Sequence, residues 1–207
     1  MHAISNPTPF NQKIRLGILW IIAICLATII LISRPMLPED GIIHEVMETV
    51  GLALLVLAVL GRLWSILYIG SKKNQELVIL GPYSMTRNPL YFSSLTGLLG
   101  VGLVYGSMVL TVVLLMAALI VFQYTALREA DFLKARFGEG YADYASRTPL
   151  ILPRPSLYAT SDEVTFSVNA LTKTLRDCLP FLVLYPIIEV VEYLHATDKL
   201  HPLLVLP

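Results

Sequence analysis

Charged residues are scarce in this chain. Asp, Glu, Lys and Arg make up 14% of its 207 residues and cancel to a net charge of zero, whereas hydrophobic residues account for 56%. Soluble globular domains carry about 25% charged residues. The composition therefore excludes that class and predicts an integral membrane protein. Without a basic excess, we expect no nucleic-acid partner.

Cysteine and histidine are also rare, with two and four copies. Cys25 and Cys178 lie in apolar surroundings without CxxC or Cys/His spacing, which argues against a disulfide framework or a zinc site. Glu189, Glu192 and His195 recur at intervals of three and would share a helix face. One histidine without a second ligand cluster does not support a metal site, so we predict no bound metal.

Long apolar runs predict the membrane spans. The spans expected are residues 16–32, 46–69, 90–104, 108–127 and 179–194. The third and fourth form a hairpin that turns at Tyr105-Gly106-Ser107. The last run contains Pro180 and Pro186 and is either a fifth span, which we favour, or a re-entrant element.

A separate amphipathic helix is expected just after the fourth span, with Phe132, Leu133 and Phe137 on one side and Gly138 and Gly140 at its end. The predicted fold class is an all-α, multi-span transmembrane helical bundle of four to five spans with a cytoplasmic C-terminal amphipathic helix region.

Lysines and arginines near the span ends predict the orientation. On one side lie Lys13, Arg15, Lys72, Lys73, Arg87, Arg128, Lys134, Arg136, Arg147 and Arg154. The loop 34–48 instead contains four acidic residues around a single arginine. The positive-inside rule then predicts a multi-pass protein with a cytoplasmic N-terminus. Residues 80–95 and 127–155 would both lie at the cytoplasmic face.

Arg62 lies inside the second span, seven residues before Ile69, or roughly 10 Å of helix rise. A charge at that depth is costly, so the side chain either snorkels toward the helix end or faces the bundle interior. The short distance to the helix end favours snorkelling.

The stretch 80–95, LGPYSMTRNPLYFSSL, is the one long polar interruption with a recognisable chemical layout. Gly81-Pro82 predicts a turn. Asn88 before Pro89 predicts an N-cap followed by the first turn of a new helix. The unpaired amides of such a helix start, with Arg87 beside them, attract carboxylates and phosphates. An ordinary capped helix start with a snorkelling arginine explains the pattern as well.

Four glycines crowd the predicted third span and the turn after it. Gly97, Gly100, Gly102 and Gly106 favour close helix packing; close passage of a cofactor is the alternative.

A second polar group follows Tyr91 by about 40 residues, and is built from Glu129, Phe137-Gly138, Tyr141, Tyr144 and Pro149. The paired segments resemble the isoprenylcysteine carboxyl methyltransferase and phospholipid methyltransferase superfamily of membrane methyltransferases. The resemblance runs from about Gly61 to Pro153. It implies a multi-span fold that binds S-adenosylmethionine at the cytoplasmic membrane surface, with a lateral opening for a lipophilic acceptor.

The resemblance divides the chain into a membrane methyltransferase-like domain, 1–155, whose motif-bearing core is 61–153, and a C-terminal extension, 156–207. It also implies the site residues. The cofactor-binding candidates are Tyr83, Arg87, Asn88, Pro89, Tyr91 and Glu129, and the catalytic candidates are Arg62 and Arg87. Arg62, if it faces inward, is the candidate to hold an anionic acceptor.

Two residues depart from the family pattern. Asn88 replaces the usual histidine and cannot titrate near neutral pH. Ala130 replaces the second glutamate of the usual pair. Cofactor binding is therefore better supported than a mechanism that needs an acid and base pair.

The predicted function is S-adenosylmethionine-dependent methyl transfer to a lipophilic small molecule or lipid. One alternative is a steroid-reductase-like membrane enzyme that binds NADPH, but Phe92-Ser93 follows Tyr91 where that family usually has Gly-Glu. The other alternative is a non-catalytic membrane module that retains the fold.

Overall fold

The computed structural model describes residues 24–37, 41–70, 72 and 75–207. Its elements are β1 (Ser33–Pro35), α2 (Ile42–Ile69), α3 (Pro82–Met85), α4 (Pro89–Val104), α5 (Met108–Phe137), α6 (Glu139–Arg147), η1 (Pro155–Leu157), α7 (Val168–Ala196) and β2 (Leu204–Leu206). Residues 24–32 are helical and lead into β1. Most of the first predicted span, 16–32, lies outside the described residues.

Three helices, α2, α5 and α7, are long and apolar enough to cross a membrane, and α4 is a shorter apolar helix. They indicate an integral, multi-pass membrane protein. The predicted third helix and the hairpin turn are confirmed, because α4 ends at Val104 and Gly106 adopts a φ of 76° before α5 begins.

Two predicted helix boundaries are wrong. The helix expected around Phe132, Leu133 and Phe137 is not separate from the fourth span, because α5 continues to Phe137 and ends where Gly138 adopts a φ of 56°; a short separate helix, α6, follows it. The favoured fifth span corresponds to α7, which is long and apolar enough to cross a membrane and ends at Ala196, but the helix begins at Val168 instead of residue 179 and continues through Pro180 and Pro186. A proline removes one backbone donor, and a well-packed membrane helix tolerates that loss.

The four glycines of the third span and its turn are packing residues, as the sequence favours. A Cβ on Gly100 would lie 2.7 Å from the carbonyl oxygen of Gly51, and one on Gly102 would overlap Thr111. Because these positions lack side chains, the backbone of α4 approaches α2 and α5 closely.

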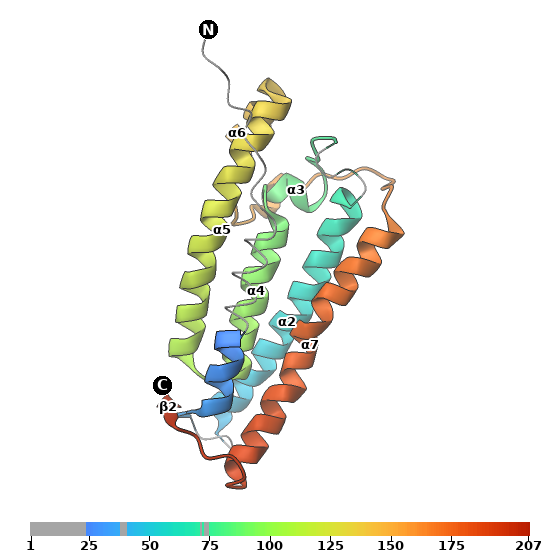
Figure 1. Cartoon of the computed structure of the whole chain (residues 1–207). Helices are drawn as coiled ribbons and strands as arrows, with labels where there is room; N and C mark the ends of the chain where they lie inside the picture. The colour runs from blue at the N-terminus through green and yellow to red at the C-terminus, as the bar shows by residue number, and fades with distance from the viewer. Residues whose placement is uncertain (1–23, 38–40, 71, 73–74) are drawn as a thin grey trace.

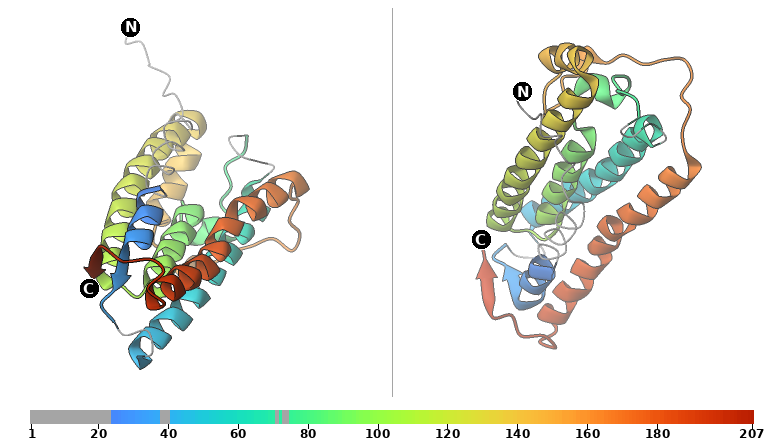
Figure 2. Two further views of the ribbon diagram at one scale, coloured as in Figure 1. Left: turned by 60° about the horizontal axis from the view of Figure 1, so that its bottom comes forward. Right: turned by 45° about the horizontal axis from the view of Figure 1, so that its top comes forward.

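Figure 1 shows how the bundle is arranged: α3 and α6 lie at the end where α4 begins and α5 ends, while β2 and the end of α7 lie at the opposite end. The rotated views agree (Figure 2). Segments 80–95 and 127–155 therefore lie at the same end of the bundle, as predicted.

The predicted helical bundle is confirmed, but the end opposite the site, which we call the remote end, adds a short sheet, so the fold is mostly and not entirely helical. Strands β1 and β2 pair in parallel, with Arg34 opposite Val205. The carbonyl oxygen of Pro207 also accepts hydrogen bonds from Ser107 Oγ at 2.7 Å and from the Val109 amide at 3.2 Å. Two short strands far apart in the chain have no hydrophobic pattern of their own, so only the folded bundle brings them together.

Candidate functional site

The site end of the bundle is built where residues 81–88 lie beside residues 149–159. The amide of Arg87 donates to the Pro149 carbonyl at 2.9 Å, and the amide of Arg154 donates to the Met85 carbonyl at 2.9 Å. Further along, the Gly81 amide donates to the Ala159 carbonyl at 2.7 Å. These reciprocal bonds hold the two polar segments together as one layer, which we call the clamp.

Side chains strengthen the clamp. Thr86, which is 1% exposed, donates through Oγ1 to the carbonyl of Ile151 at 2.9 Å. Asn88 donates through Nδ2 to the carbonyl of Leu150 at 3.0 Å. Asn88 does occupy the N-cap position of α4, but its side chain does not cap the helix. The predicted capping role is wrong because the amide group is turned toward Leu150 instead.

Helix α6 covers α3. The rings of Tyr141 and Tyr144 meet edge to face with their centroids 6.1 Å apart, which confirms that they share a face. The Tyr144 hydroxyl donates to the Tyr83 carbonyl at 2.6 Å, and the Tyr141 hydroxyl accepts from Arg87 Nη1 at 3.4 Å. Gly138 permits this arrangement, because its positive φ turns the chain sharply between α5 and α6.

Tyr83 is buried and is influenced by several charged or polar side chains of the site. Burial raises the pKa of its hydroxyl far above the ordinary value; Tyr144 and Glu129 raise this pKa further, whereas Arg62 lowers it. Burial also raises the pKa of Tyr144, with a further increase from Tyr141 and an opposing effect of Arg87. Both hydroxyls are therefore neutral at physiological pH, and Tyr83 is within electrostatic reach of both Glu129 and Arg62.

Arg62 faces the bundle interior. Its Nη1 donates to Ser94 Oγ on α4 at 2.6 Å, so the interpretation as a snorkelling residue is wrong. A hydroxyl acceptor on the neighbouring helix holds the guanidinium inside the bundle. Neither the spacing of Arg62 nor the Ser93-Ser94 pair signals this contact in the sequence.

Three buried polar atoms at this end have no hydrogen-bond partner within the described part of the chain: Arg62 Nε, Tyr83 Oη and Arg87 Nε. Buried donors are usually paired, and leaving one unpaired costs about 1–3 kcal/mol. Glu129 on α5 is half-buried and close enough to affect Tyr83. A ligand with acceptor oxygens and a positive charge would complement this set of side chains.

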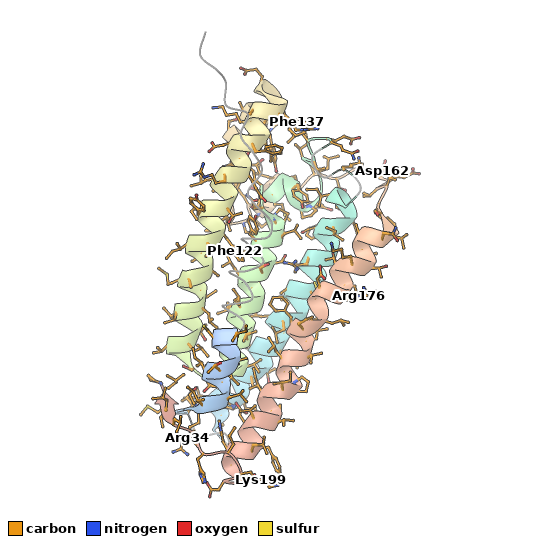
Figure 3. All side chains as sticks on the ribbon, viewed as in Figure 1. Arg34, Phe122, Phe137, Asp162, Arg176 and Lys199 are labelled. Carbon is orange, nitrogen blue, oxygen red and sulfur yellow. The ribbon has the colours of Figure 1, made fainter. Side chains whose placement is uncertain are left out.

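The other two cofactor candidates occupy the first turn of α4. Tyr91 stacks on Phe122 of α5 with ring centroids 4.9 Å apart and an interplanar angle of 8°. Figure 3 labels Phe122 along α5 and Phe137 at its site end. Pro89 is buried and begins α4. One ring face of Tyr91 is therefore already covered, and Pro89 shapes the site through the backbone.

An apolar cleft of about 1060 Å³ lies beside this cluster. It is lined by α2, α4 and α5 and reaches Pro82, Thr86 and Pro89 at the site end. Arg62, Arg87 and Glu129 do not line it. Gly61 and Ser93 both line the cleft and pack closely, because a Cβ on Gly61 would be 2.6 Å from Ser93 Oγ.

The acidic and histidine side chains near the C-terminus lie at the remote end. Glu192 and His195 are buried, whereas Glu189 is exposed, and His44 Nε2 lies 4.0 Å from a Glu192 carboxylate oxygen. In the part of the chain that the structure describes, no group of three or more His, Cys, Asp or Glu side chains has a geometry that could hold a metal.

Comparison with known proteins identifies the family. The family model for phospholipid methyltransferases matches residues 46–140. The chain is 33% identical over 208 residues to the nickel-cobalt-cadmium resistance protein NccN of Alcaligenes xylosoxydans xylosoxydans, covering 99% of this chain and 97% of that protein. It is 36% identical over 164 residues to the cobalt-zinc-cadmium resistance protein CzcN of Cupriavidus metallidurans, covering 79% of this chain and 76% of that protein. No solved structure matches. The resemblance found in the paired motifs is thus confirmed, and the chain belongs to the phospholipid methyltransferase family.

Proposed function

We propose that this protein transfers the methyl group of S-adenosylmethionine to a lipophilic acceptor, either a carboxylate or a lipid head group, at the cytoplasmic membrane face. The observation that carries the proposal is the set of buried, unpartnered donors on Arg62, Tyr83 and Arg87 at one end of the bundle. Glu129 adds a carboxylate within electrostatic reach of Tyr83. Family membership makes a methyltransferase the first activity to test.

The roles of the cofactor residues follow from their charge. Arg87 would bind the carboxylate of the cofactor through its guanidinium. Glu129 would bind the ammonium group or the ribose hydroxyls. The neutral Tyr83 hydroxyl would donate to or accept from the same ligand. When bound, S-adenosylmethionine supplies an electrophilic methyl group carried on a sulfonium.

Methyl transfer is an in-line displacement, so the protein contributes mainly by positioning the reactants and excluding water. The clamp and α6 hold Tyr83 and Arg87 in place through backbone bonds. Asn88 and Ala130 provide no titrating pair, which suits an acceptor that needs no general base.

The apolar cleft suits the hydrocarbon part of an acceptor. Its walls come from membrane-spanning helices, and its upper end is formed by Pro82, Thr86 and Pro89, which flank Tyr83 and Arg87 in the chain. An acyl or prenyl chain in this cleft would keep the acceptor at the edge of the polar cluster. We also propose the orientation that the lysine and arginine distribution predicts, with the site end in the cytoplasm.

Isothermal titration with S-adenosylmethionine in detergent tests the cofactor assignment. Arg87→Ala combined with Glu129→Ala should weaken binding by at least about tenfold, because two charge-assisted contacts are lost. Arg154→Ala combined with Glu139→Ala is the matched control, since both side chains are exposed. Unchanged affinity in the first double variant would show that the cofactor does not bind here, and saturable NADPH binding would favour the reductase alternative.

The names of the two relatives support a second proposal, about physiological role: methylation by this protein contributes to resistance to metals such as cobalt or cadmium. A deletion strain should grow poorly at raised cobalt or cadmium concentration. The wild-type chain should restore growth, and the Arg87→Ala/Glu129→Ala variant should not. Full rescue by that variant would show that metal resistance does not depend on this site.

A further inference from the structure

Helix α6 covers the polar site with only two buried side chains. Tyr141 and Tyr144 are each 4% exposed, and they are the buried residues of this helix. The side chains of Glu139, Asp143 and Arg147 are exposed. Asp143 and Arg147 form a salt bridge of 2.9 Å with each other, within α6 itself. The helix is therefore attached to the bundle mainly through one face that carries two tyrosines.

Both tyrosines contact residues of the proposed cofactor site. The Tyr144 hydroxyl donates to the Tyr83 carbonyl at 2.6 Å, and the Tyr141 hydroxyl accepts from Arg87 Nη1 at 3.4 Å. Two further polar atoms of the same residues, Tyr83 Oη and Arg87 Nε, are buried and have no hydrogen-bond partner in the described ranges. Helix α6 therefore covers polar atoms that remain available to a ligand.

A ligand has no open route to these atoms in this structure. Neither the apolar cleft nor the smaller cavity beside Tyr68 is lined by Tyr83, Arg87 or Glu129. A charged cofactor arrives from water, and α3 and α6 lie at the end of the bundle where the site is (Figure 1). Backbone bonds of the clamp hold both ends of α3, whereas α6 has its two tyrosine contacts. Helix α6 is thus the covering element that can move at the lowest cost.

The joint between α5 and α6 is suited to such a movement. Gly138 has a φ of 56° and a ψ of −128°, a conformation that L side chains rarely adopt. A Cβ at Gly138 would meet nothing within 4 Å, so the backbone and not the packing requires glycine here. At the other end of α6, Thr148 is extended and the Pro149 carbonyl is held by the Arg87 amide. The nine-residue helix therefore lies between a glycine joint and the clamp, and can lift as a unit.

We propose that α6 is a lid over the cofactor site, hinged at Gly138 and latched by the bond from Tyr144 to the Tyr83 carbonyl. This inference rests on the proposed function and adds the route by which S-adenosylmethionine enters and leaves. In the closed lid, Tyr141 also orients the Arg87 guanidinium, so both tyrosines are positioning residues. Opening exposes Tyr83 and Arg87 to water, and closing excludes water from the bound cofactor.

Hydrogen exchange without ligand measures how often the lid opens. In the full chain in phosphatidylcholine nanodiscs, Gly138→Ala should lower the protection of the α6 amides about tenfold, because alanine is strained at this positive φ. Tyr144→Phe should lower it about five- to tenfold, because the latch is lost. The amides of α5 should keep their protection. Gly140→Ala is the matched control and should not lower protection, since a Cβ there also meets nothing within 4 Å but the residue lies inside the helix.

Binding kinetics test whether the lid controls access. Surface plasmon resonance with S-adenosylmethionine gives the association and dissociation rate constants of each variant. Both constants should rise about fivefold or more in Gly138→Ala and Tyr144→Phe, because the open fraction increases and the closed lid holds the ligand less firmly. A variant that merely damages the site would not associate faster. Tyr193→Phe, at an exposed tyrosine of the remote end, is the matched control for loss of a hydroxyl.

Two results would overturn the inference. Unchanged α6 protection in both lid variants would show that α6 is a fixed part of the site. Faster exchange with an unchanged association rate would show that the cofactor enters elsewhere. Absent S-adenosylmethionine binding by wild-type protein would instead contradict the proposed function, and it is distinguishable because the exchange measurement needs no ligand. If Gly138→Ala does not fold, as judged by its melting temperature, Tyr144→Phe still provides both readouts.

Discussion

Thr86 offers the sharpest test of the clamp that shapes the site. Its hydroxyl donates to Ile151 at 2.9 Å, lies 3.3 Å from the Leu150 carbonyl, and accepts from the Asn88 amide at 3.3 Å. Thr86→Val preserves the shape of the buried side chain and removes these bonds. The substitution therefore removes hydrogen bonds without changing the side-chain shape, and it acts on the contact between residues 81–88 and 149–159.

The magnitude follows from the groups left behind. Leu150 keeps its bond from Asn88 Nδ2, so the Ile151 carbonyl is the main group that loses its donor, while the Asn88 amide loses only a longer, part-buried contact of 3.3 Å. An unsatisfied buried polar group costs about 1–3 kcal/mol, and we take about 2 kcal/mol. Because 1.4 kcal/mol corresponds to a factor of ten, the equilibrium for opening the clamp should rise about 25-fold.

Hydrogen exchange in detergent measures this change. The amides of Arg87 and Arg154 donate across the clamp, so their protection should fall about 25-fold in Thr86→Val. Thr96→Val is the matched control, because Thr96 Oγ1 donates to the Phe92 carbonyl within α4 itself. Unchanged protection in Thr86→Val, or an equal loss in Thr96→Val, would refute the reasoning.

Three other predictions concern stability and orientation. Gly100→Ala should lower the free energy of unfolding by about 1–3 kcal/mol, measured by thermal denaturation in detergent, because the new Cβ would lie 2.7 Å from the Gly51 carbonyl oxygen; an unchanged melting temperature would contradict the close packing. The Tyr83 hydroxyl should make the protein less stable as pH rises above the ordinary tyrosine pKa of 10.0, because it ionises there in the unfolded state while its raised pKa keeps it protonated in the folded state. Between pH 9 and 11 the melting temperature should therefore fall more steeply for wild type than for Tyr83→Phe. An equal fall in both proteins would contradict the burial of Tyr83. With the native cysteines replaced, an impermeant maleimide should label Thr197→Cys on intact cells and Ser156→Cys only after permeabilisation, whereas the reverse pattern would invert the proposed orientation.

The sequence by itself determined the parts of this protein that depend on neighbouring residues. Apolar runs set the helices that became α2, α4 and α5, and Gly106 marked the turn between the last two, because span length and positive φ are local properties. The paired motifs around Arg87 and Glu129 identified the family, since their residue types and spacing are read directly along the chain.

Tertiary structure alone decided how those side chains are used. Whether Arg62 snorkels or turns inward depends on Ser94, 32 residues away, and the role of Asn88 depends on a carbonyl 62 residues away. The parallel pairing of β1 with β2 likewise joins residues 33–35 with residues 204–206. Each of these contacts joins residues far apart in the chain, so it forms only when packing of the bundle brings them within hydrogen-bond distance.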